Sequence, residues 1–292
     1  MDTQILSGKV VSESVYENLK SRINKLASNA IKPGLAVILV GDDGPSQVYV
    51  RNKTKTFTSL GLYSETIKLK SDTSQNKLIE IVQKLNDDNK YHGILVQLPL
   101  PDHIDNEAVI KSINPKKDVD GFHPVNLGNL TAGKPSFVPC TPKGIMKVLE
   151  YYNIDLSNKH VVVVGRSNIV GRPISILTSL KRKYSNATTT ICHSGTKNIS
   201  YYTKQADVVI LALGYPAFLK GNDIKEGAVI IDVGINRVKN TESNIFKLVG
   251  DCDEFSVKGK ASYLTPVPGG IGPMTIAMLV ENTIEAAEME IK

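Results

Sequence analysis

The chain has 292 residues, contains no tryptophan, and has only 6% aromatic residues. So few aromatic side chains argue against a large aromatic core and against a surface that stacks nucleic-acid bases. No apolar run approaches the length needed to span a bilayer, so we expect no membrane-spanning helix and no membrane partner. Like charges never gather in a run of five or six, so no nucleic-acid-binding tail is predicted.

Cysteine is also scarce. Cys140, Cys192 and Cys252 are odd in number and widely separated, and the C-x-x-C spacing of redox and metal sites is missing. We therefore expect reduced thiols, no metal site and a cytoplasmic protein. The N-terminal sequence MDTQILSGKVVSESV has neither the basic start nor the apolar core of a signal peptide, which favours the same compartment.

The net charge is positive, +6 from 35 Lys and Arg against 29 Asp and Glu. Because the lysines are scattered, a solvated basic surface is a better interpretation than nucleic-acid binding. A third interpretation is that the charge attracts an anionic small molecule.

Short apolar runs recur along the chain, and each ends in glycine, proline or a polar residue. They are GLAVILVGDD, GILVQLPLP, HVVVVGRS, TTTICHSG, DVVILALG and AVIIDVGIN. Runs that are apolar on both faces are typical of buried parallel strands. Segments with helical spacing, such as NKLIEIVQKLND and TPKGIMKVLEYYN, lie between them, so we predict an α/β fold with helices on both faces of the sheets.

A stretch rich in Gly, Pro and Asn, HPVNLGNLTAGKPSFVPCTP, interrupts this alternation and predicts a domain boundary near residue 140. The final segment, GPMTIAMLVENTIEAAEMEI, is predicted to form one long amphipathic helix that could pack on either domain. Its glutamates, Glu281, Glu285 and Glu288, lie on one side of that helix.

The segment HVVVVGRSNIVGRP has the order strand, tight turn, helix that is typical of a dinucleotide site. Gly165 closes the strand, Gly171 follows six residues later, and Pro173 suits an early helical position. Backbone donors at such a helix start can hold a pyrophosphate. The fit to G-x-G-x-x-G is imperfect, because Ser167 replaces the second glycine and the last glycine comes one place late, so an ordinary strand-to-helix turn stays open.

The next predicted strand, TTTICHSGT, ends in His193, Ser194, Gly195 and Thr196, without a carboxylate. Sites that prefer NAD usually end this strand with an acid that holds the ribose hydroxyls. Arg166 lies in the first turn, so a basic, hydroxyl-lined pocket favours the 2′-phosphate of NADP. His193 alone is more often a structural histidine than a ligand.

Tyr49 and Lys53 are four residues apart on a helix that we predict for residues 45–60, from Pro45 to just before Gly61. Such a pair is common by chance. In short-chain dehydrogenases a Y-x-x-x-K pair is catalytic, but there it follows the glycine turn, whereas here it precedes it. The pair therefore predicts a separate substrate domain.

Two further polar positions are expected near this pair. Gln97 ends the apolar strand GILVQLPLP, and ligands of open α/β sheets gather beyond the carboxyl ends of strands. Asp118 and Asp120 lie in a turn with Gly121, where Asx-turn chemistry is the simpler explanation for one of them.

Eight motifs occur in this order: YVRNKTK, VQLPLP, KDVDGFHPVNLG, PCTPKGI, GRSNIVGRP, CHSGT, DVGIN and PGGIGPMT. Together they resemble the methylenetetrahydrofolate dehydrogenase/methenyltetrahydrofolate cyclohydrolase family of the FolD type, from about residue 4 to the final helix. Ile271 stands where the family usually has valine, and Thr56 where alanine is usual. Neither departure removes a polar group that the chemistry needs.

The resemblance implies two reactions: NADP-dependent oxidation of 5,10-methylenetetrahydrofolate to the methenyl cation, and hydrolysis of that cation to 10-formyltetrahydrofolate. It implies that Lys53 is the general acid/base, that Tyr49 contacts the folate, that Gln97 orients the lysine and that Asp120 holds the pterin. We also hypothesise that Arg51, Lys55 and the bound cation lower the pKa of Lys53.

The resemblance further implies two domains. Residues 1–139 plus 266–292 are expected to form a folate domain, and residues 140–265 a Rossmann-type NADP domain. It also implies an active-site cleft between the two domains and a homodimer joined through the NADP domains. The expected substrate-binding residues are Tyr49, Gln97, Leu98, Asp120, Pro268, Gly269 and Gly270. The expected cofactor-binding residues are Thr141, Gly165, Arg166, Ser167, Val170, Gly171, His193, Ser194, Gly234 and Ile235. Two alternatives remain: a shikimate-type dehydrogenase of another small substrate, and a family member with a single activity.

Overall fold

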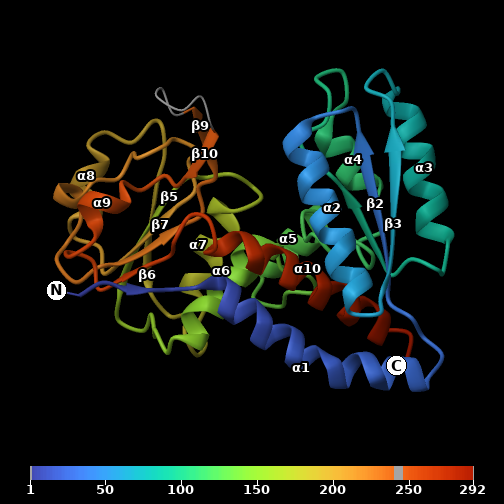
Figure 1. Cartoon of the computed structure of the whole chain (residues 1–292), viewed down its shortest axis with the longest axis horizontal. Coiled ribbons are helices and arrows are strands. Elements are labelled where there is room, and N and C mark those ends of the chain that lie inside the picture. The colour runs from blue at the N-terminus through green and yellow to red at the C-terminus, as the bar shows by residue number, and fades with distance from the viewer. Residues whose placement is uncertain (1, 240–245, 292) are drawn as a thin grey trace. The chain divides into compact units, whose positions relative to one another are not determined.

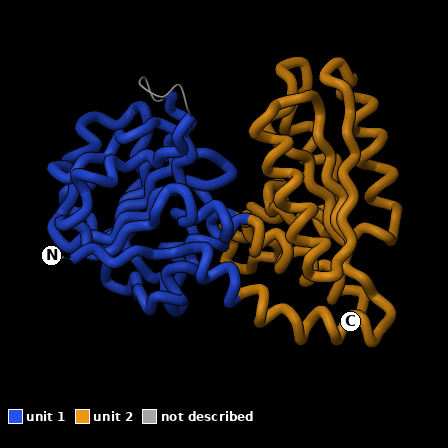
Figure 2. Tube along the Cα trace, viewed as in Figure 1, with its two compact units in different colours: residues 1–14, 141–275 blue, residues 15–140, 276–292 orange. Residues whose placement is uncertain are grey.

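The computed structural model describes residues 2–239 and 246–291. The chain divides into two compact units, which Figure 2 colours separately. Unit 1 contains residues 1–14 and 141–275, and unit 2 contains residues 15–140 and 276–292. Each unit is built on its own parallel sheet.

Unit 2 holds a three-stranded parallel sheet in the order β3-β2-β4. Its strands are β2 (Gly34–Val40), β3 (Tyr63–Leu69) and β4 (Gly93–Val96). All residues of β2 and β4 are buried, as the continuous apolar runs predicted. The helices α2 (Gly44–Ser59) and α3 (Gln75–Asp87) pack beside this sheet (Figure 1).

The spacing of apolar residues determines which face of each helix is buried. In α3 the buried residues are Leu78, Val82 and Leu85, which recur at intervals of four and three. They belong to the same hydrophobic cluster as the apolar residues of β2 and β4. The shorter helices α4 (Asn106–Ser112) and α5 (Pro124–Thr131) complete this part of unit 2.

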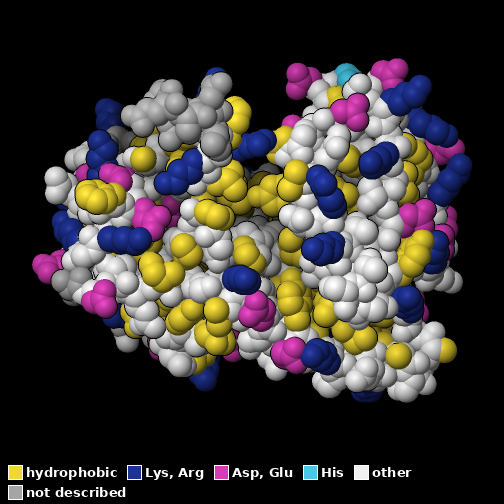
Figure 3. Space-filling view, viewed as in Figure 1, with side chains coloured by type: hydrophobic (Ala, Val, Ile, Leu, Met, Phe, Trp, Pro, Cys, Tyr) yellow, Lys and Arg dark blue, Asp and Glu magenta, His cyan; other side chains and the backbone are white. Residues whose placement is uncertain are grey.

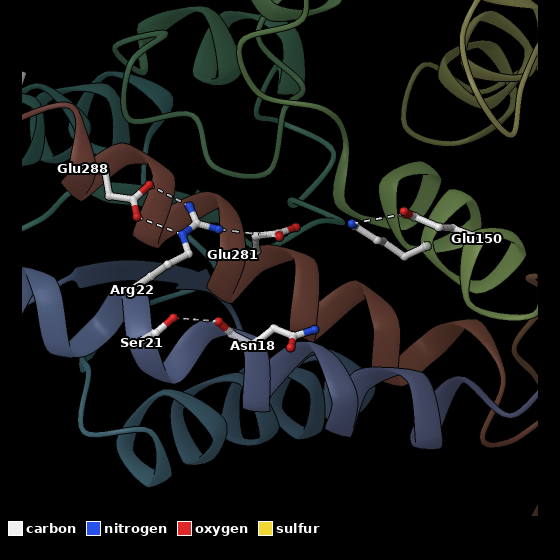
Figure 4. Close-up of polar contacts among 7 residues, drawn as sticks. Asn18, Ser21, Arg22, Glu150, Glu281 and Glu288 are labelled. Carbon is white, nitrogen blue, oxygen red and sulfur yellow. Dashed lines mark hydrogen bonds and ion pairs between the residues drawn. The ribbon is translucent and has the colours of Figure 1, made fainter.

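Two long helices, α1 (Gly8–Ser28) and α10 (Ile271–Glu288), each contribute residues to both units. Within unit 2 they are joined by Arg22, which donates from Nε to Oε1 of Glu288 at 2.8 Å and from Nη2 to Oε2 at 2.7 Å (Figure 4). Nη1 of Arg22 also lies 3.7 Å from Oε1 of Glu281. Two glutamates of the predicted amphipathic face, Glu281 and Glu288, therefore contact α1. No helix among the described residues has the length and apolar character to cross a membrane.

Unit 1 holds a six-stranded parallel sheet in the order β1-β11-β8-β7-β5-β6. The strands are β1 (Gln4–Ile5), β5 (His160–Val164), β6 (Thr188–Cys192), β7 (Val208–Leu211), β8 (Val229–Asp232) and β11 (Tyr263–Leu264). Its helices are α6 (Cys140–Tyr151), α7 (Gly171–Ser179), α8 (Ile199–Thr203), the 3-10 turn η1 (Gly221–Asp223) and α9 (Glu254–Val257). A separate antiparallel pair joins β9 (Asn236–Lys239) and β10 (Phe246–Val249).

The strand order places a topological switch point beside β5. From β5 the chain passes to β6 on one side, and it then returns to β7 on the other side of β5. Ligands of open α/β sheets bind at the carboxyl ends of the strands at such a point. The turn after β5 and the segment after β7 are therefore the positions where a dinucleotide is expected.

The predicted fold class is confirmed: the protein is an α/β protein with parallel sheets and a Rossmann-type second half. The contacts divide the terminal segments differently from the predicted domain limits, because β1 pairs with β11 and residues 266–275 also belong to unit 1. The assignment of residues 1–139 plus 266–292 to folate and of residues 140–265 to NADP concerns ligands and stays a prediction.

We expect Arg22→Met to lower the free energy of unfolding by about 1 kcal/mol, because it removes a two-pronged, charge-assisted contact between α1 and α10. Urea denaturation measures this change. The matched control is Lys20→Met, whose pair with Glu17 is well exposed, and it should change stability by less than about 0.5 kcal/mol. An equal fall in the free energy of unfolding in both variants would show that the Arg22 contact stabilises the protein no more than an exposed ion pair does.

Candidate active site

Lys53 lies on the buried face of α2. Asp43 caps this helix by accepting a hydrogen bond from the backbone nitrogen of Ser46 at 2.9 Å, and Pro45 occupies its first turn. The buried residues of α2 are Ser46, Val50, Lys53 and Phe57, spaced four, three and four apart. The lysine thus stands in the row that otherwise packs on the core, and its exposed fraction is only 7%.

Gln97 provides the polar partner that a buried amine requires. Nζ of Lys53 donates to Oε1 of Gln97 at 3.0 Å, and Nε2 of Gln97 donates to the carbonyl oxygen of Leu98 at 2.7 Å. The backbone nitrogen of Gln97 bonds to Ile38 O in the neighbouring strand at 2.9 Å. The amide therefore presents its oxygen to the lysine, because its nitrogen is already used.

Burial is the main cause of the lowered pKa of Lys53, since a charged ammonium is poorly solvated there. Electrostatic interactions with Asp120 and Cys140 oppose this effect. Arg51 and Lys55, which we expected to lower the pKa, are exposed on α2 and are not among its causes. The structure therefore corrects the explanation: loss of water, rather than crowding of like charge, favours the neutral amine.

The two acidic residues of the KDVDGF turn have different surroundings. Asp118 is buried and accepts hydrogen bonds from the backbone nitrogens of Phe122 (3.2 Å) and His123 (2.8 Å) and from Nδ2 of Asn126 (2.7 Å). Burial raises its pKa to about 6. Asp118 is thus the structural member of the pair, and Asp120 is the one left to face Lys53.

Asp120 and Lys53 influence each other's protonation. Burial raises the pKa of Asp120, while Lys53 and a hydrogen bond with Cys140 lower it. Tyr49, one helical turn before Lys53, is half-buried, and burial raises the pKa of its phenol. Unit 2 therefore brings Tyr49, Lys53, Gln97 and Asp120, the four predicted catalytic residues, to one part of its surface. Within the described residues no group of His, Cys, Asp and Glu is arranged to hold a metal ion.

In unit 1 the predicted dinucleotide turn depends on close backbone approach. Gly165 has a φ of +134°, and a Cβ there would clash with the carbonyl oxygen of Ala212. A Cβ at Gly171 would clash with the carbonyl oxygen of Gly165. Oγ of Ser167 accepts hydrogen bonds from the backbone nitrogens of Val170 (3.2 Å) and Gly171 (3.4 Å). The serine that departs from the glycine pattern therefore shapes the start of α7.

The end of β6 lies beside this turn. Nη1 of Arg166 is 3.4 Å from Nε2 of His193. The backbone nitrogen of His193 donates to Oγ1 of Thr196 at 2.9 Å, so the residues after β6 form a compact turn that contains Ser194. Because residues 193–196 include no carboxylate, the turn fits a cofactor with a phosphate on its ribose.

The remaining predicted site residues also lie in unit 1. Oγ1 of Thr141 is hydrogen-bonded to Oγ1 of Thr275 at 2.9 Å. Gly234 and Ile235 follow β8, and Ile235 is exposed. Pro268, Gly269 and Gly270 lie just before α10, where the carbonyl oxygen of Gly269 accepts from the backbone nitrogen of Lys9 at 3.2 Å.

Two buried acids in unit 1 were missed from the sequence. Asp232 ends β8, and Asp251 follows β10; their exposed fractions are 3% and 0%. The only signal was an acid directly after an apolar run in AVIIDVGIN and in KLVGDCD. Most of their partners are backbone nitrogens of segments distant in sequence, which no local pattern reveals.

Unit 1 has a Rossmann-type parallel sheet with a glycine turn after β5, and unit 2 is an α/β unit with a buried lysine. These features are typical of a two-domain, dinucleotide-dependent enzyme. The family model "Tetrahydrofolate dehydrogenase/cyclohydrolase, catalytic domain" matches residues 6–120. The model "Tetrahydrofolate dehydrogenase/cyclohydrolase, NAD(P)-binding domain" matches residues 139–291. The chain therefore belongs to the tetrahydrofolate dehydrogenase/cyclohydrolase family.

Curated relatives agree over the whole length. The chain is 51% identical to the "Bifunctional protein FolD" of Acetivibrio thermocellus, covering 100% of this chain and 99% of that protein. The protein of the same name from Moorella thermoacetica is 52% identical, with 98% and 99% covered.

Solved structures give the same result. The bifunctional FolD enzyme of Campylobacter jejuni has a TM-score of 0.93 at 48% identity, with 99% of both chains covered. The Trypanosoma brucei enzyme, complexed with NADP cofactor and inhibitor, has a TM-score of 0.94 at 34% identity, with 100% of this chain and 99% of that chain covered. A shikimate dehydrogenase from Aquifex aeolicus reaches only 0.51 at 14% identity, with 89% and 98% covered, and shares the fold alone.

We expect Gly171→Ala to destabilise the protein by about 1–3 kcal/mol, because the added methyl group would push α7 away from the Gly165 turn. Its affinity for NADP should fall as well, which isothermal calorimetry measures. In the control Gly128→Ala, within α5, the new Cβ meets nothing within 4 Å and should leave stability unchanged or raise it by up to about 1 kcal/mol. Normal NADP affinity in Gly171→Ala would contradict the assignment of this turn.

Proposed function

We infer that this protein is a bifunctional enzyme of one-carbon folate interconversion. It oxidises 5,10-methylenetetrahydrofolate to 5,10-methenyltetrahydrofolate with NADP, and it hydrolyses the methenyl compound to 10-formyltetrahydrofolate. The observation that carries this conclusion is the buried Lys53 amine, held by Gln97 and close to Asp120, in a chain whose two halves both match the family.

The oxidation requires the two reacting carbons to be aligned. NADP, when bound, supplies the hydride acceptor. We propose that the backbone at the start of α7, from Ser167 to Gly171, holds its pyrophosphate. Arg166, with the hydroxyl-rich turn after β6, would hold the 2′-phosphate, and Thr141, Gly234 and Ile235 would border the site.

The hydrolysis requires proton movement, for which a neutral lysine is suited. A water molecule adds to the methenyl carbon, and the neutral amine of Lys53 accepts the proton that this water loses. The resulting ammonium then donates a proton to the ring nitrogen as the bond from that nitrogen to the carbon breaks. The hydroxyl of the adduct gives its own proton to the amine as the C=O bond forms, which leaves the formyl group on the other nitrogen. Gln97 keeps Nζ in place through its 3.0 Å hydrogen bond.

The pterin presents a 2-amino group and a ring N–H, two donors on one edge that one carboxylate can accept. We propose that Asp120 binds this edge, since the other acid of the turn, Asp118, is fully engaged by protein donors. Tyr49 would pack on the folate. Leu98 and the segment Pro268, Gly269 and Gly270 would line its site.

The alternative functions have weaker support. A shikimate-type dehydrogenase is favoured only by a distant likeness of fold. A single-activity member of the family is disfavoured because Tyr49, Lys53, Gln97 and Asp120 are all present. For nucleic-acid binding, the face drawn in Figure 3 shows Lys and Arg interspersed with Asp and Glu rather than gathered in one basic patch. The net charge of +6 suits the anionic NADP and the glutamate tail of folate.

We also propose a homodimer joined through unit 1. The outer strand β6 has unpaired backbone groups along one edge and an exposed Ile191, features that suit pairing with a second copy. A reducing compartment such as the cytoplasm suits the buried thiols Cys140, Cys192 and Cys252.

We expect Lys53→Met to lower the rate of methenyl hydrolysis at least about 100-fold, because the proton carrier is lost, while substrate binding changes by less than about threefold. The measurement follows loss of the methenyl chromophore, corrected for uncatalysed hydrolysis. In the wild type the rate should rise with pH through the lowered pKa of Lys53, because the neutral amine is the active form.

The variant Lys53→Arg cannot lose its proton in this range and should lack that pH-dependent rise. Lys55→Met, an exposed neighbour on the same helix, should behave as the wild type. Hydrolysis by Lys53→Met at the wild-type rate would eliminate Lys53 as the proton carrier.

We expect Arg166→Ala to raise the KM for NADP about tenfold or more, because a charge-assisted contact to the 2′-phosphate is lost, and to change the KM for NAD by less than about twofold. Dehydrogenase assays with each cofactor measure this. Arg172→Ala is the control, since this exposed arginine donates to Oδ1 of Asn168 at 2.8 Å within the same turn and helix. An equal effect on both cofactors would remove Arg166 from the 2′-phosphate site.

A further inference from the structure

Asp251 collects backbone donors from the segment that follows β7. Its Oδ2 accepts hydrogen bonds from the backbone nitrogens of Leu213 (2.7 Å) and Gly214 (3.0 Å). Its Oδ1 accepts from the backbone nitrogen of Tyr215 (3.0 Å) and from Nδ2 of Asn236 (2.9 Å). One carboxylate therefore fixes three consecutive peptide groups and one side chain from the segment after β8.

Asp232 holds Asp251 in place from the other side. Oδ1 of Asp232 accepts from the backbone nitrogens of Gly234 (2.8 Å) and Asp251 (3.0 Å), and Oδ2 accepts from that of Cys252 (2.8 Å). The segments that follow β7, β8 and β10 are thus tied together by two buried carboxylates. Hydrogen bonds to charged acceptors are stronger than neutral ones, so this tie is rigid.

Two glycines show how closely the backbone approaches these acids. A Cβ at Gly234 would clash with Oδ1 of Asp251, and a Cβ at Gly250 would clash with Oδ2 of Asp232. Any side chain at either position would push a carboxylate off its donors. The glycines and the acids therefore form one arrangement rather than separate loop features.

The segment that Asp251 holds lies at the switch point of the sheet. The backbone nitrogen of Ala212 donates to the carbonyl oxygen of Val164 at 2.9 Å, and the carbonyl oxygen of Ala212 occupies the space next to Gly165. On its other side the segment is open, because a Cβ at Gly214 would meet nothing within 4 Å and Tyr215 is 64% exposed. Residues 213–215 are therefore hydrogen-bonded to Asp251 on one side, and their other side is free to contact a ligand.

We propose that Asp251 is a positioning residue for the dinucleotide: it fixes the backbone of Leu213, Gly214 and Tyr215 against the Gly165 turn and thereby sets the affinity for NADP. The proposal rests on the proposed NADP-dependent function. A carboxylate near an anionic cofactor is electrostatically unfavourable, so its presence is explained by the four donors that it organises.

The test is Asp251→Asn, in which one acceptor oxygen becomes a donor facing backbone N–H groups. Calorimetry should show NADP affinity falling at least about tenfold, and the KM for NADP should rise in parallel. Hydrolysis of the methenyl compound without cofactor should stay within about twofold of the wild type, because Lys53 lies in unit 2. Removing a negative charge should by itself strengthen the binding of an anionic ligand. A loss of NADP affinity would therefore be caused by the disturbed hydrogen bonds to residues 213–215.

The matched control is Asp253→Asn, which makes the same charge change two residues along at a half-exposed position whose side chain does not cap α9. It should bind NADP as the wild type does. If Asp251→Asn does not fold, Asn236→Ala, which removes one of the four donors, should weaken NADP binding about three- to fivefold with hydrolysis retained.

Three outcomes are distinguishable. Unchanged NADP affinity in a folded Asp251→Asn, or in Asn236→Ala where that variant replaces it, would overturn the proposal. Parallel loss of NADP binding and hydrolysis in the variant tested would also overturn it, since Asp251 would then be only structural. A wild-type protein that neither reduces NADP nor hydrolyses the methenyl compound would instead refute the proposed function.

Discussion

A single amine buried in the apolar row of α2 is the constraint on which the chemistry depends. In water the nitrogen of Lys53 would be protonated and useless as a base at neutral pH. Within unit 2 burial lowers its pKa, and Gln97 accepts a hydrogen bond that keeps the nitrogen in place. Asp120 opposes the lowering of the pKa, so burial and this carboxylate act on the amine in opposite directions.

Unit 1 depends on a different constraint, the close approach of backbone segments around the turn that follows β5. The turn after β5 requires glycine at residues 165 and 171, because carbonyl oxygens occupy the space where side chains would stand. The segments after β7 and β8 are held by hydrogen bonds to buried carboxylates. Both devices keep side chains away from the carboxyl edge of the sheet, where ligands of open α/β sheets bind, and the space beside Gly214 is open.

Much of the site could be predicted because its residues are tied to local patterns. Pro45 and Gly61 bounded a helix for residues 45–60, and α2 spans Gly44–Ser59. Gln97 was expected near Lys53 because it ends a buried strand, and the two side chains are indeed bonded. The part of the pKa hypothesis that invoked Arg51 and Lys55 was wrong, because burial, a property of the folded chain, is the largest cause of the lowered pKa of Lys53. The effect of a bound cation stays a prediction.

Local patterns along the chain were sufficient to predict the alternation of strands and helices, the glycine turn, the absence of an acid after β6 and the polar residues of the site. These follow from local spacing, because strand and helix periodicity are written along the chain. The folded chain was needed to show which acid of the Asp118 and Asp120 pair is structural, how β1 and residues 266–275 join unit 1, and why Asp232 and Asp251 are buried. The contacts of β1, Asp232 and Asp251 join segments that are distant in sequence. Those of Asp118 form only when residues 118–126 have folded into their turn and the start of α5, so none of these partners is in place before folding.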